Sequence, residues 1–130
     1  MNNEKTVSKM TKAELIELVR ENFSVEPDYP FENDSDTAVL RHNDCGKWFG
    51  IVMNIPKNRL GLNSTLPADI LNVKCDPEVG ASFVDNSVFF PAYHMNKRHW
   101  LSVLLEKAGR EDIMFLLNIS YDLTRPRRKK

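Results

Sequence analysis

The sequence has no apolar run that approaches the roughly 18 residues of a membrane-spanning helix. Its polar start, Met1-Asn-Asn-Glu-Lys, lacks the pattern of a signal peptide. Only two cysteines, Cys45 and Cys75, occur in 130 residues. These absences indicate a cytoplasmic protein without membrane association, in which both cysteines are reduced thiols rather than a disulfide. With 42% hydrophobic and 28% charged residues, a chain of this length fits one soluble globular domain.

Metal-binding and catalytic patterns are also missing. No CxxC or HxxxH pair is present, so His94, His99 and Cys75 form no recognisable zinc motif. The acidic loop at residues 24–36 lacks the glycine and the terminal glutamate of a calcium-binding loop. No catalytic signature links either histidine to a nucleophile and an orienting partner. We therefore expect no metal, no cofactor and no enzymatic activity. The histidines should be neutral and hydrogen-bonded to the backbone, and Cys75 should be a small buried thiol.

The whole chain has no excess of positive or negative charge, but its parts do. Lys and Arg number 18, as do Asp and Glu, yet five of the last six residues are basic. Without residues 125–130, thirteen cations remain against 18 anions. An acidic body attracts polyanions poorly, so nucleic-acid binding would depend on local patches. The basic tail is either one such patch or a solvated, disordered end.

Helices are predicted near both ends of the chain. Thr11 and Glu14 have the spacing of a capping box, and the apolar residues that follow predict a helix of about twelve residues. A closing amphipathic helix is predicted over residues 110–123, with acidic residues at its positive end. A shorter helix is expected to begin after Asp76, which would cap it, and to end near Val84.

Between the helices lie runs rich in β-branched and aromatic residues. Residues 37–42 and 48–55 flank an Asn/Asp/Gly turn and predict a β-hairpin. Residues 70–75 predict a further strand, after a polar connector at residues 56–68 that could form a surface loop or wing. Residues 99–105 fit a helix or a strand. This order predicts an α+β single domain whose antiparallel sheet is covered on one face by the N- and C-terminal helices.

The densest group of ligand-binding side chains is the segment Tyr93-His-Met-Asn-Lys-Arg-His-Trp100. On an extended segment Lys97 and Arg98 would point to opposite faces, whereas in a loop Arg98 could offer its guanidinium to a carboxylate or phosphate. The alternative is that Arg98 pairs with a fixed internal acid such as Asp76 or Asp122. The large aromatic residues either stack on bases or lie partly buried in the core: Trp48, Tyr93 and Trp100.

Three segments resemble, in order and spacing, the motifs of the MmcQ/YjbR-like family of small bacterial proteins: Asn72-Val-Lys-Cys-Asp-Pro-Glu78, Tyr93–Trp100 and Ser120-Tyr-Asp-Leu123. The resemblance covers residues 11–124, and leaves residues 1–10 as a flexible lead-in and residues 125–130 as a basic tail. It implies a CyaY-like (frataxin-like) fold and favours a strand at residues 99–106. Members of the family are commonly described as DNA-binding, from a likeness of their strands and loops to a double-wing arrangement.

The resemblance and the local cluster of cations and aromatic rings together predict a non-enzymatic binding protein with DNA as its ligand. Phosphate contacts are expected from Lys57, Arg59, Lys74, Lys97 and Arg98. The site is expected to be shaped by Tyr93, His94 and Trp100. The alternative is a module that binds a small anionic ligand or a protein partner in a pocket formed by this motif. The sequence predicts no oligomeric state.

Overall fold

Five antiparallel strands form one sheet in a computed structural model of the chain, which describes residues 9–126. The strands are β1 (Ala38–Arg41), β2 (Trp48–Pro56), β3 (Pro67–Lys74), β4 (Phe89–Pro91) and β5 (Trp100–Leu104), in the order β1-β2-β3-β5-β4. The helices are α1 (Lys12–Phe23), α2 (Pro77–Phe83) and α3 (Arg110–Thr124), with 3-10 turns η1 (Lys57–Leu60) and η2 (Leu105–Lys107). The predicted α+β class with an antiparallel sheet is confirmed, and residues 100–104 form a strand.

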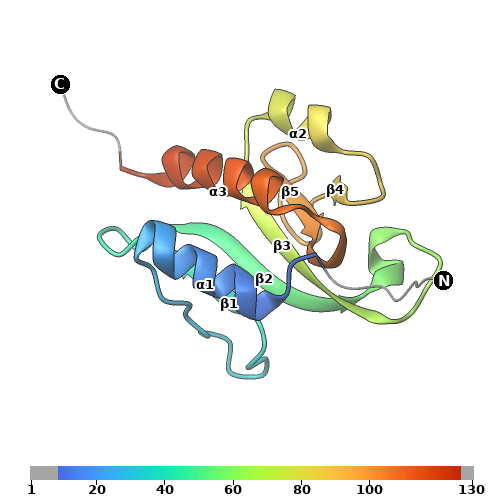
Figure 1. Ribbon diagram of the computed structural model, residues 1–130, viewed down its shortest axis with the longest axis horizontal. Helices are drawn as coiled ribbons and strands as arrows, with labels where there is room; N and C mark the ends of the chain where they lie inside the picture. Colours follow the sequence, from blue (N-terminus) through green and yellow to red (C-terminus); the bar gives the residue numbers. More distant parts are fainter. Residues whose placement is uncertain (1–8, 127–130) are drawn as a thin grey trace.

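Helices α1 and α3 lie side by side on one face of the sheet, here called the helix face (Figure 1). The predicted capping box starts α1: the Thr11 hydroxyl accepts from the Glu14 amide at 3.1 Å, and the Glu14 carboxylate accepts from the Thr11 amide at 2.9 Å. Apolar residues of both helices then pack on alternate residues of the strands, such as Leu71 and Val73 of β3. This packing is the main core of the domain.

Polar side chains near the end of α3 connect this helix to the hairpin. The buried Ser120 hydroxyl donates to the Phe49 carbonyl at 2.6 Å and accepts from the Lys74 amide at 2.9 Å, so it bridges β2 and β3 where their ladder ends. His42, 3% exposed, places its Nε2 2.7 Å from the Thr124 hydroxyl. Burial lowers the pKa of His42, because the charged imidazolium is poorly solvated there.

The opposite face of the sheet, here called the loop face, is partly covered by residues from three connecting segments, which lie within residues 24–36, 57–66 and 92–99. Its apolar floor is a second, smaller cluster that includes Ile55, Ile70 and Phe90. Side chains from two of the covering segments, Leu60 and Tyr93, pack against this cluster. The sequence motif therefore lies on the side of the sheet that the helices leave free.

Several boundaries differ from the sequence prediction. Strand β3 begins at Pro67 rather than at residue 70, because its ladder with β2 extends to the pair Pro56–Pro67. The predicted loose lead-in is wrong for Met10, which is 4% exposed in the core. Helix α2 begins at Pro77 as expected, but the Asp76 side chain makes no capping hydrogen bond. Residues 1–8 and 127–130, with most of the predicted lead-in and basic tail, lie outside the described residues.

Within residues 9–126, no helix is both long enough and apolar enough to cross a bilayer.

Candidate functional site

A buried hydrogen-bond network fixes the start of the motif on the loop face. Asn72 of β3 and Ser102 of β5 are directly opposite each other in the sheet, and both are completely buried. The Ser102 hydroxyl donates to the Asn72 side-chain oxygen and accepts from the Tyr93 amide at 2.9 Å. The Asn72 side-chain amide donates to the Tyr93 carbonyl at 3.0 Å. Both backbone polar groups of Tyr93 are therefore held by the sheet, and we call this network the Asn72–Ser102 clamp.

A turn around Asn96 completes the shape of the motif. The Asn96 side-chain oxygen accepts from the Arg98 amide at 2.8 Å, and its carbonyl accepts from the Trp100 amide at 2.9 Å. The chain then rejoins the sheet, where the His99 carbonyl accepts from the Cys75 amide at 2.9 Å. His94 has a left-handed backbone with φ of 61°, which costs a non-glycine residue of order 1–3 kcal/mol. The clamp and the turn together hold this conformation.

Three concavities follow one another along the motif. The first has a volume of about 390 Å³ and lies over β2, with Met53 and Ile55 from that strand. Its remaining lining residues come from the segment before β1, from β2 and from the motif: Phe31, Asp34, Thr37, Asn54, Tyr93 and His94. This volume is within the range of about 300–1,000 Å³ that is usual for ligand sites.

The second and third concavities carry the cations. The second, of about 220 Å³, is lined by Arg59, Tyr93 and Lys97 together with apolar residues. The third, of about 240 Å³, is lined by Lys97, Arg98 and Trp100 beside α2. Tyr93 borders the first two and Lys97 borders the last two. The three therefore adjoin, and we call them together the motif surface.

The cations of the motif surface are available to a ligand. Arg59, Lys97 and Arg98 are exposed, and none of the ion pairs found among the described residues involves them. The Lys97 ammonium donates one hydrogen bond, to the Ala92 carbonyl at 2.9 Å, and an ammonium has three donors. The alternative prediction that Arg98 pairs with an internal acid is wrong for the described part of the chain.

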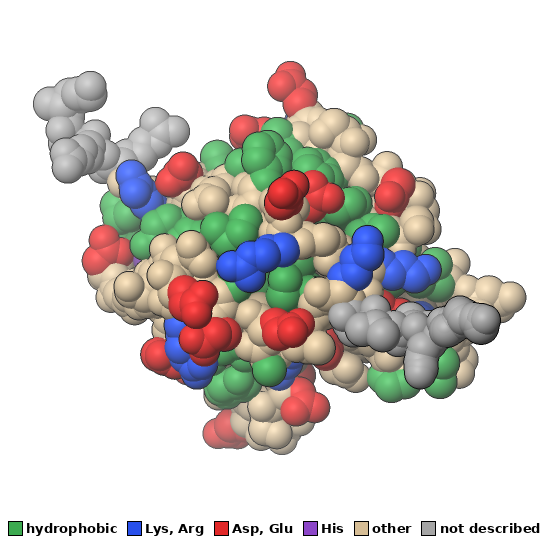
Figure 2. All heavy atoms as spheres, in the orientation of Figure 1, with side chains coloured by type: hydrophobic (Ala, Val, Ile, Leu, Met, Phe, Trp, Pro, Cys, Tyr) green, Lys and Arg blue, Asp and Glu red, His purple; other side chains and the backbone are tan. Residues whose placement is uncertain are grey.

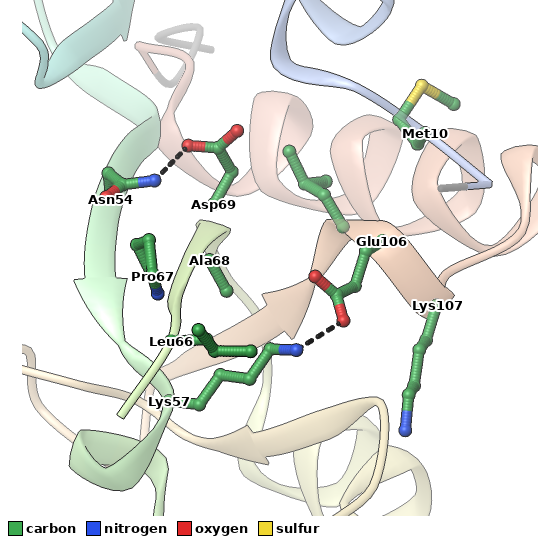
Figure 3. A pocket seen from close by; sticks show the side chains of 10 residues that line it. Met10, Asn54, Lys57, Leu66, Pro67, Ala68, Asp69, Glu106 and Lys107 are labelled. Carbon is green, nitrogen blue, oxygen red and sulfur yellow. Dashed lines mark hydrogen bonds and ion pairs between the residues drawn. The ribbon is translucent and has the colours of Figure 1, made fainter. Parts of the chain in front are cut away.

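Lys57, which was predicted to contact phosphate, lies elsewhere. Its ammonium is 2.8 Å from the Glu106 carboxylate, and both side chains are mostly buried. The pair lines a separate cavity of about 630 Å³ on the helix face, beside Met10 and Asp69. Figure 3 shows the Lys57 side chain turned toward Glu106, with Asp69 hydrogen-bonded to its strand neighbour. Because its charge is already compensated, Lys57 is not a free phosphate ligand.

Lys74 and the histidines also differ from the predicted arrangement. Lys74 is half-buried at the end of β3, paired across the sheet with Trp100. His94 and His99 are exposed, and within residues 9–126 their rings make no hydrogen bond, so the expected bonds to the backbone are wrong. His94 instead packs on the Tyr93 ring, with ring centroids 4.0 Å apart. Trp100 is partly buried, as predicted for the tryptophans.

The cysteines behave as predicted. Both are free thiols, with Cys45 exposed and Cys75 buried. Burial raises the pKa of the Cys75 thiol, and the nearby Asp76 charge raises it further. No group of three or more His, Cys, Asp or Glu residues that could hold a metal ion occurs within residues 9–126.

Most residues that line the first concavity were not predicted from the sequence, Phe31 and Asp34 among them. Phe31 is 41% exposed and contacts Trp48 edge to face, with centroids 6.1 Å apart. Asp34 accepts hydrogen bonds from the Asp36 and Thr37 amides at 3.0 and 3.1 Å and from the Thr37 hydroxyl, and these bonds lower the pKa of its carboxyl. The signal in the sequence was Asp34-Ser-Asp-Thr37, because an aspartate commonly bonds the backbone two or three residues on. This loop is thus organised, not merely solvated.

The helix face is a poor candidate for a polyanion site. Figure 2 shows acidic side chains scattered over this face, with basic side chains in small separate groups between them. The exposed side of α1 carries Glu14, Glu17 and Glu21. The motif surface extends from the loop face to the edge of the sheet beside α2, and it gathers three cations without an ion-pair partner among the described residues, together with aromatic residues.

Comparisons with known proteins agree with the arrangement of these elements. The sequence model of the YjbR family matches residues 21–123. The Bacillus subtilis "Uncharacterized protein YyaQ" is 38% identical over 117 residues, which are 89% of this chain and 99% of the relative. A crystal structure of a Pseudomonas syringae protein has a TM-score of 0.85 at 37% identity, and covers 89% of this chain and 100% of its own. A Deinococcus radiodurans protein with a DUF419 domain has a TM-score of 0.66 at 23% identity, covers 92% of this chain and 81% of its own, and shares the fold.

Proposed function

This chain belongs to the YjbR family, and we propose that it is a non-enzymatic DNA-binding protein whose ligand surface is the motif surface. The observation that carries the proposal is that Arg59, Lys97 and Arg98 line adjoining concavities with no carboxylate partner in the described residues. Phosphate groups bind such cations through charge-assisted hydrogen bonds. Tyr93 and Trp100, which border the same concavities, offer rings for stacking.

The absence of enzymatic activity is part of the same proposal. A histidine that acts as a general base needs an orienting partner and a nearby group to deprotonate. The rings of His94 and His99 form no hydrogen bond to a carboxylate or a hydroxyl within residues 9–126. Both rings are exposed, and His94 also lines the first concavity, which suits contact with a ligand better than proton transfer.

The frataxin-like and double-wing descriptions of the fold also belong to this proposal. An antiparallel sheet with α1 and α3, from opposite ends of the chain, packed on one face supports the first. The connectors at residues 57–66 and 92–99, which extend over the loop face and carry Arg59 and Lys97, support the second. A cytoplasmic location stays a prediction from the sequence.

Salt dependence of binding gives a quantitative test. Three phosphate contacts predict that log Kd rises with log salt with a slope of about 2.7 for duplex DNA, and about 2.1 for a single strand. A change from 50 to 200 mM salt should then weaken duplex binding about 40-fold. A fluorescein-labelled duplex and the corresponding single strand, titrated in fluorescence anisotropy at both salt concentrations, measure this slope.

A matched pair of triple variants distinguishes DNA binding at the motif surface from nonspecific attraction by positive charge elsewhere. Arg59→Gln/Lys97→Gln/Arg98→Gln should abolish the salt-dependent binding. Lys47→Gln/Lys107→Gln/Arg110→Gln removes the same number of exposed cations from other surfaces and should bind as the parent does. DNA binding that is absent at 50 mM salt, or equally affected by both triple variants, would refute the proposal.

A second candidate is a module for a small anionic ligand or for a protein partner. The concavity of about 390 Å³ favours this candidate, because its volume is sufficient for a small molecule and its lining includes the apolar residues Met53 and Ile55. Thermal-shift measurements with phosphorylated and carboxylated compounds test it. Stabilisation by one of them, together with no DNA binding, would replace the first candidate with the second.

A further inference from the structure

The first concavity of the motif surface has the lining expected for a flat aromatic ligand. Two aromatic rings line it, from Phe31, which is 41% exposed, and from Tyr93, which is half-buried. Met53 and Ile55 of β2 supply an apolar floor. Flat aromatic groups gain stacking contacts from such rings and dispersion contacts from a thioether floor.

The polar rim of this concavity selects among flat ligands. Asp34 is held in place by the Thr37 backbone and hydroxyl, and its carboxylate keeps acceptor capacity beyond these bonds. An ionised carboxylate accepts hydrogen bonds from N–H donors and repels an anionic group. The ring that fits beside Asp34 therefore carries an amino group and no negative charge of its own.

An anionic group on the same ligand has a site across Tyr93. The neighbouring concavity, which Tyr93 also borders, presents Arg59 and Lys97. One aromatic side chain therefore separates an apolar slot with an acidic rim from a pair of free cations. A molecule with a neutral, amino-bearing ring at one end and a phosphate at the other matches both halves.

We propose that Phe31 and Tyr93 bind the base of a nucleotide with an exocyclic amino group, while Arg59 and Lys97 bind its phosphate. Adenine and cytosine have such an amino group, and uracil has none. The inference rests on the proposed function, because it uses the motif surface and makes the ligand a single nucleotide unit. That unit is either a free nucleotide or an unpaired nucleotide of a single strand, since a base inside a duplex is stacked and paired.

The reporter for the test is already in the chain. Trp48 contacts Phe31, so binding in the slot should change its fluorescence. The full-length protein is titrated with AMP, CMP, UMP, adenosine and inorganic phosphate, and then with single-stranded dA12 and a duplex of the same length. We expect AMP and CMP to bind more tightly than UMP, and inorganic phosphate to leave the tryptophan fluorescence unchanged.

Three variants test which residues bind the base and which bind the phosphate. Phe31→Leu keeps an apolar side chain but removes the ring, and should weaken AMP and dA12 about 5- to 150-fold, the range expected for base stacking on an aromatic side chain. Arg59→Gln/Lys97→Gln should weaken AMP but leave adenosine unchanged. Phe115→Leu, a substitution of a 52% exposed phenylalanine on α3, is the control and should bind as the parent does. Far-UV circular dichroism and the thermal midpoint show that each variant is folded.

The outcomes separate this inference from the proposed function. DNA binding that depends on the cations, with AMP inactive and Phe31→Leu unchanged, overturns the nucleotide pocket and leaves the proposed function intact. AMP binding that depends on Phe31, with no binding of either DNA, supports the pocket for free nucleotides and refutes DNA binding. No response to any nucleotide or DNA overturns both. Binding of dA12 and AMP, both weakened by Phe31→Leu, supports the pocket and the proposed function together.

Discussion

Removal of the Ser102 hydroxyl should destabilise the domain much more than removal of an exposed hydroxyl. In Ser102→Ala the Tyr93 amide loses its acceptor and the Asn72 side-chain oxygen loses its donor. A buried polar group left without a partner costs about 1–3 kcal/mol. Two such groups lower the free energy of unfolding by about 2–6 kcal/mol, a large share of the 5–15 kcal/mol that is typical of a domain.

Urea denaturation followed by tryptophan fluorescence measures this change. With a slope of about 2 kcal/mol/M, in the middle of the range that small proteins show in urea, the midpoint of Ser102→Ala should fall by about 1–3 M. Ser82→Ala is the control, because Ser82 is exposed on α2 and bonds only the Val79 carbonyl. Its effect should stay within about 0.5 kcal/mol. Equal midpoints for the two variants would refute the idea that the clamp stabilises the fold.

Two further measurements show that the effect arises at the clamp. Hydrogen exchange of the Tyr93 amide should accelerate in Ser102→Ala, because this amide loses its hydrogen bond while the surrounding strands keep theirs. In a double-mutant cycle, Asn72→Ala and Ser102→Ala should be non-additive by about 1 kcal/mol or more, because each single variant already breaks the bond between the two side chains. Additive effects with unchanged exchange would place the loss outside the clamp.

Three further predictions concern the helix face and the thiols. Ser120→Ala should lower the free energy of unfolding by about 2–6 kcal/mol, because the Phe49 carbonyl and the Lys74 amide both lose their partner; a urea midpoint equal to that of the parent would contradict this. The pKa of His42 is lowered in the folded state from its ordinary value of 6.5, so the unfolded chain binds more protons as the pH falls below that value. The free energy of unfolding should therefore be highest above pH 6.5 and decrease as the pH falls through the folded pKa of His42. In His42→Gln, the urea midpoints at pH 7.5 and pH 5.5 should differ less than they do in the parent protein. Iodoacetamide at pH 8 should alkylate the exposed Cys45 in the native protein and leave Cys75 unmodified, because burial raises the pKa of the Cys75 thiol and shields it; mass spectrometry showing equal modification would contradict the buried position.

Local signals in the sequence were sufficient to predict the elements that depend on local interactions. The capping box at Thr11, the hairpin turn before β2 and the periodicity of α3 all appear in the structure. Residues 99–105 were ambiguous, because a five-residue apolar strand and one face of a helix have similar patterns. Only the pairing of β5 with its neighbours makes this segment a strand, and pairing is a long-range property.

The candidate site was predictable in its position along the chain but not in its partners. Lys57 and Arg59 are two residues apart in one connector. Lys57 nevertheless forms an ion pair with Glu106 on the helix face, whereas Arg59 borders the motif surface. The clamp had a recognisable signal, since Asn72 and Ser102 are single polar residues inside otherwise apolar strand runs. Such a residue has to find a hydrogen-bond partner when it is buried. This pattern could not predict the partner, which in the structure is the backbone of Tyr93.

The backbone and several side chains of residues 93–100 have different roles in the structure. The backbone of Tyr93, Asn96 and His99 makes the hydrogen bonds that fix the segment to the sheet. The side chains of His94 and Arg98 remain exposed, and no described residue forms an ion pair with either. Substitution of these side chains should therefore change binding with little effect on stability, whereas substitution of the clamp should lower stability and disorder the binding surface with it. Under the proposed function, His94 and Arg98 are presented by a backbone that the sheet holds before any ligand arrives, and this is the preorganisation that a binding surface needs.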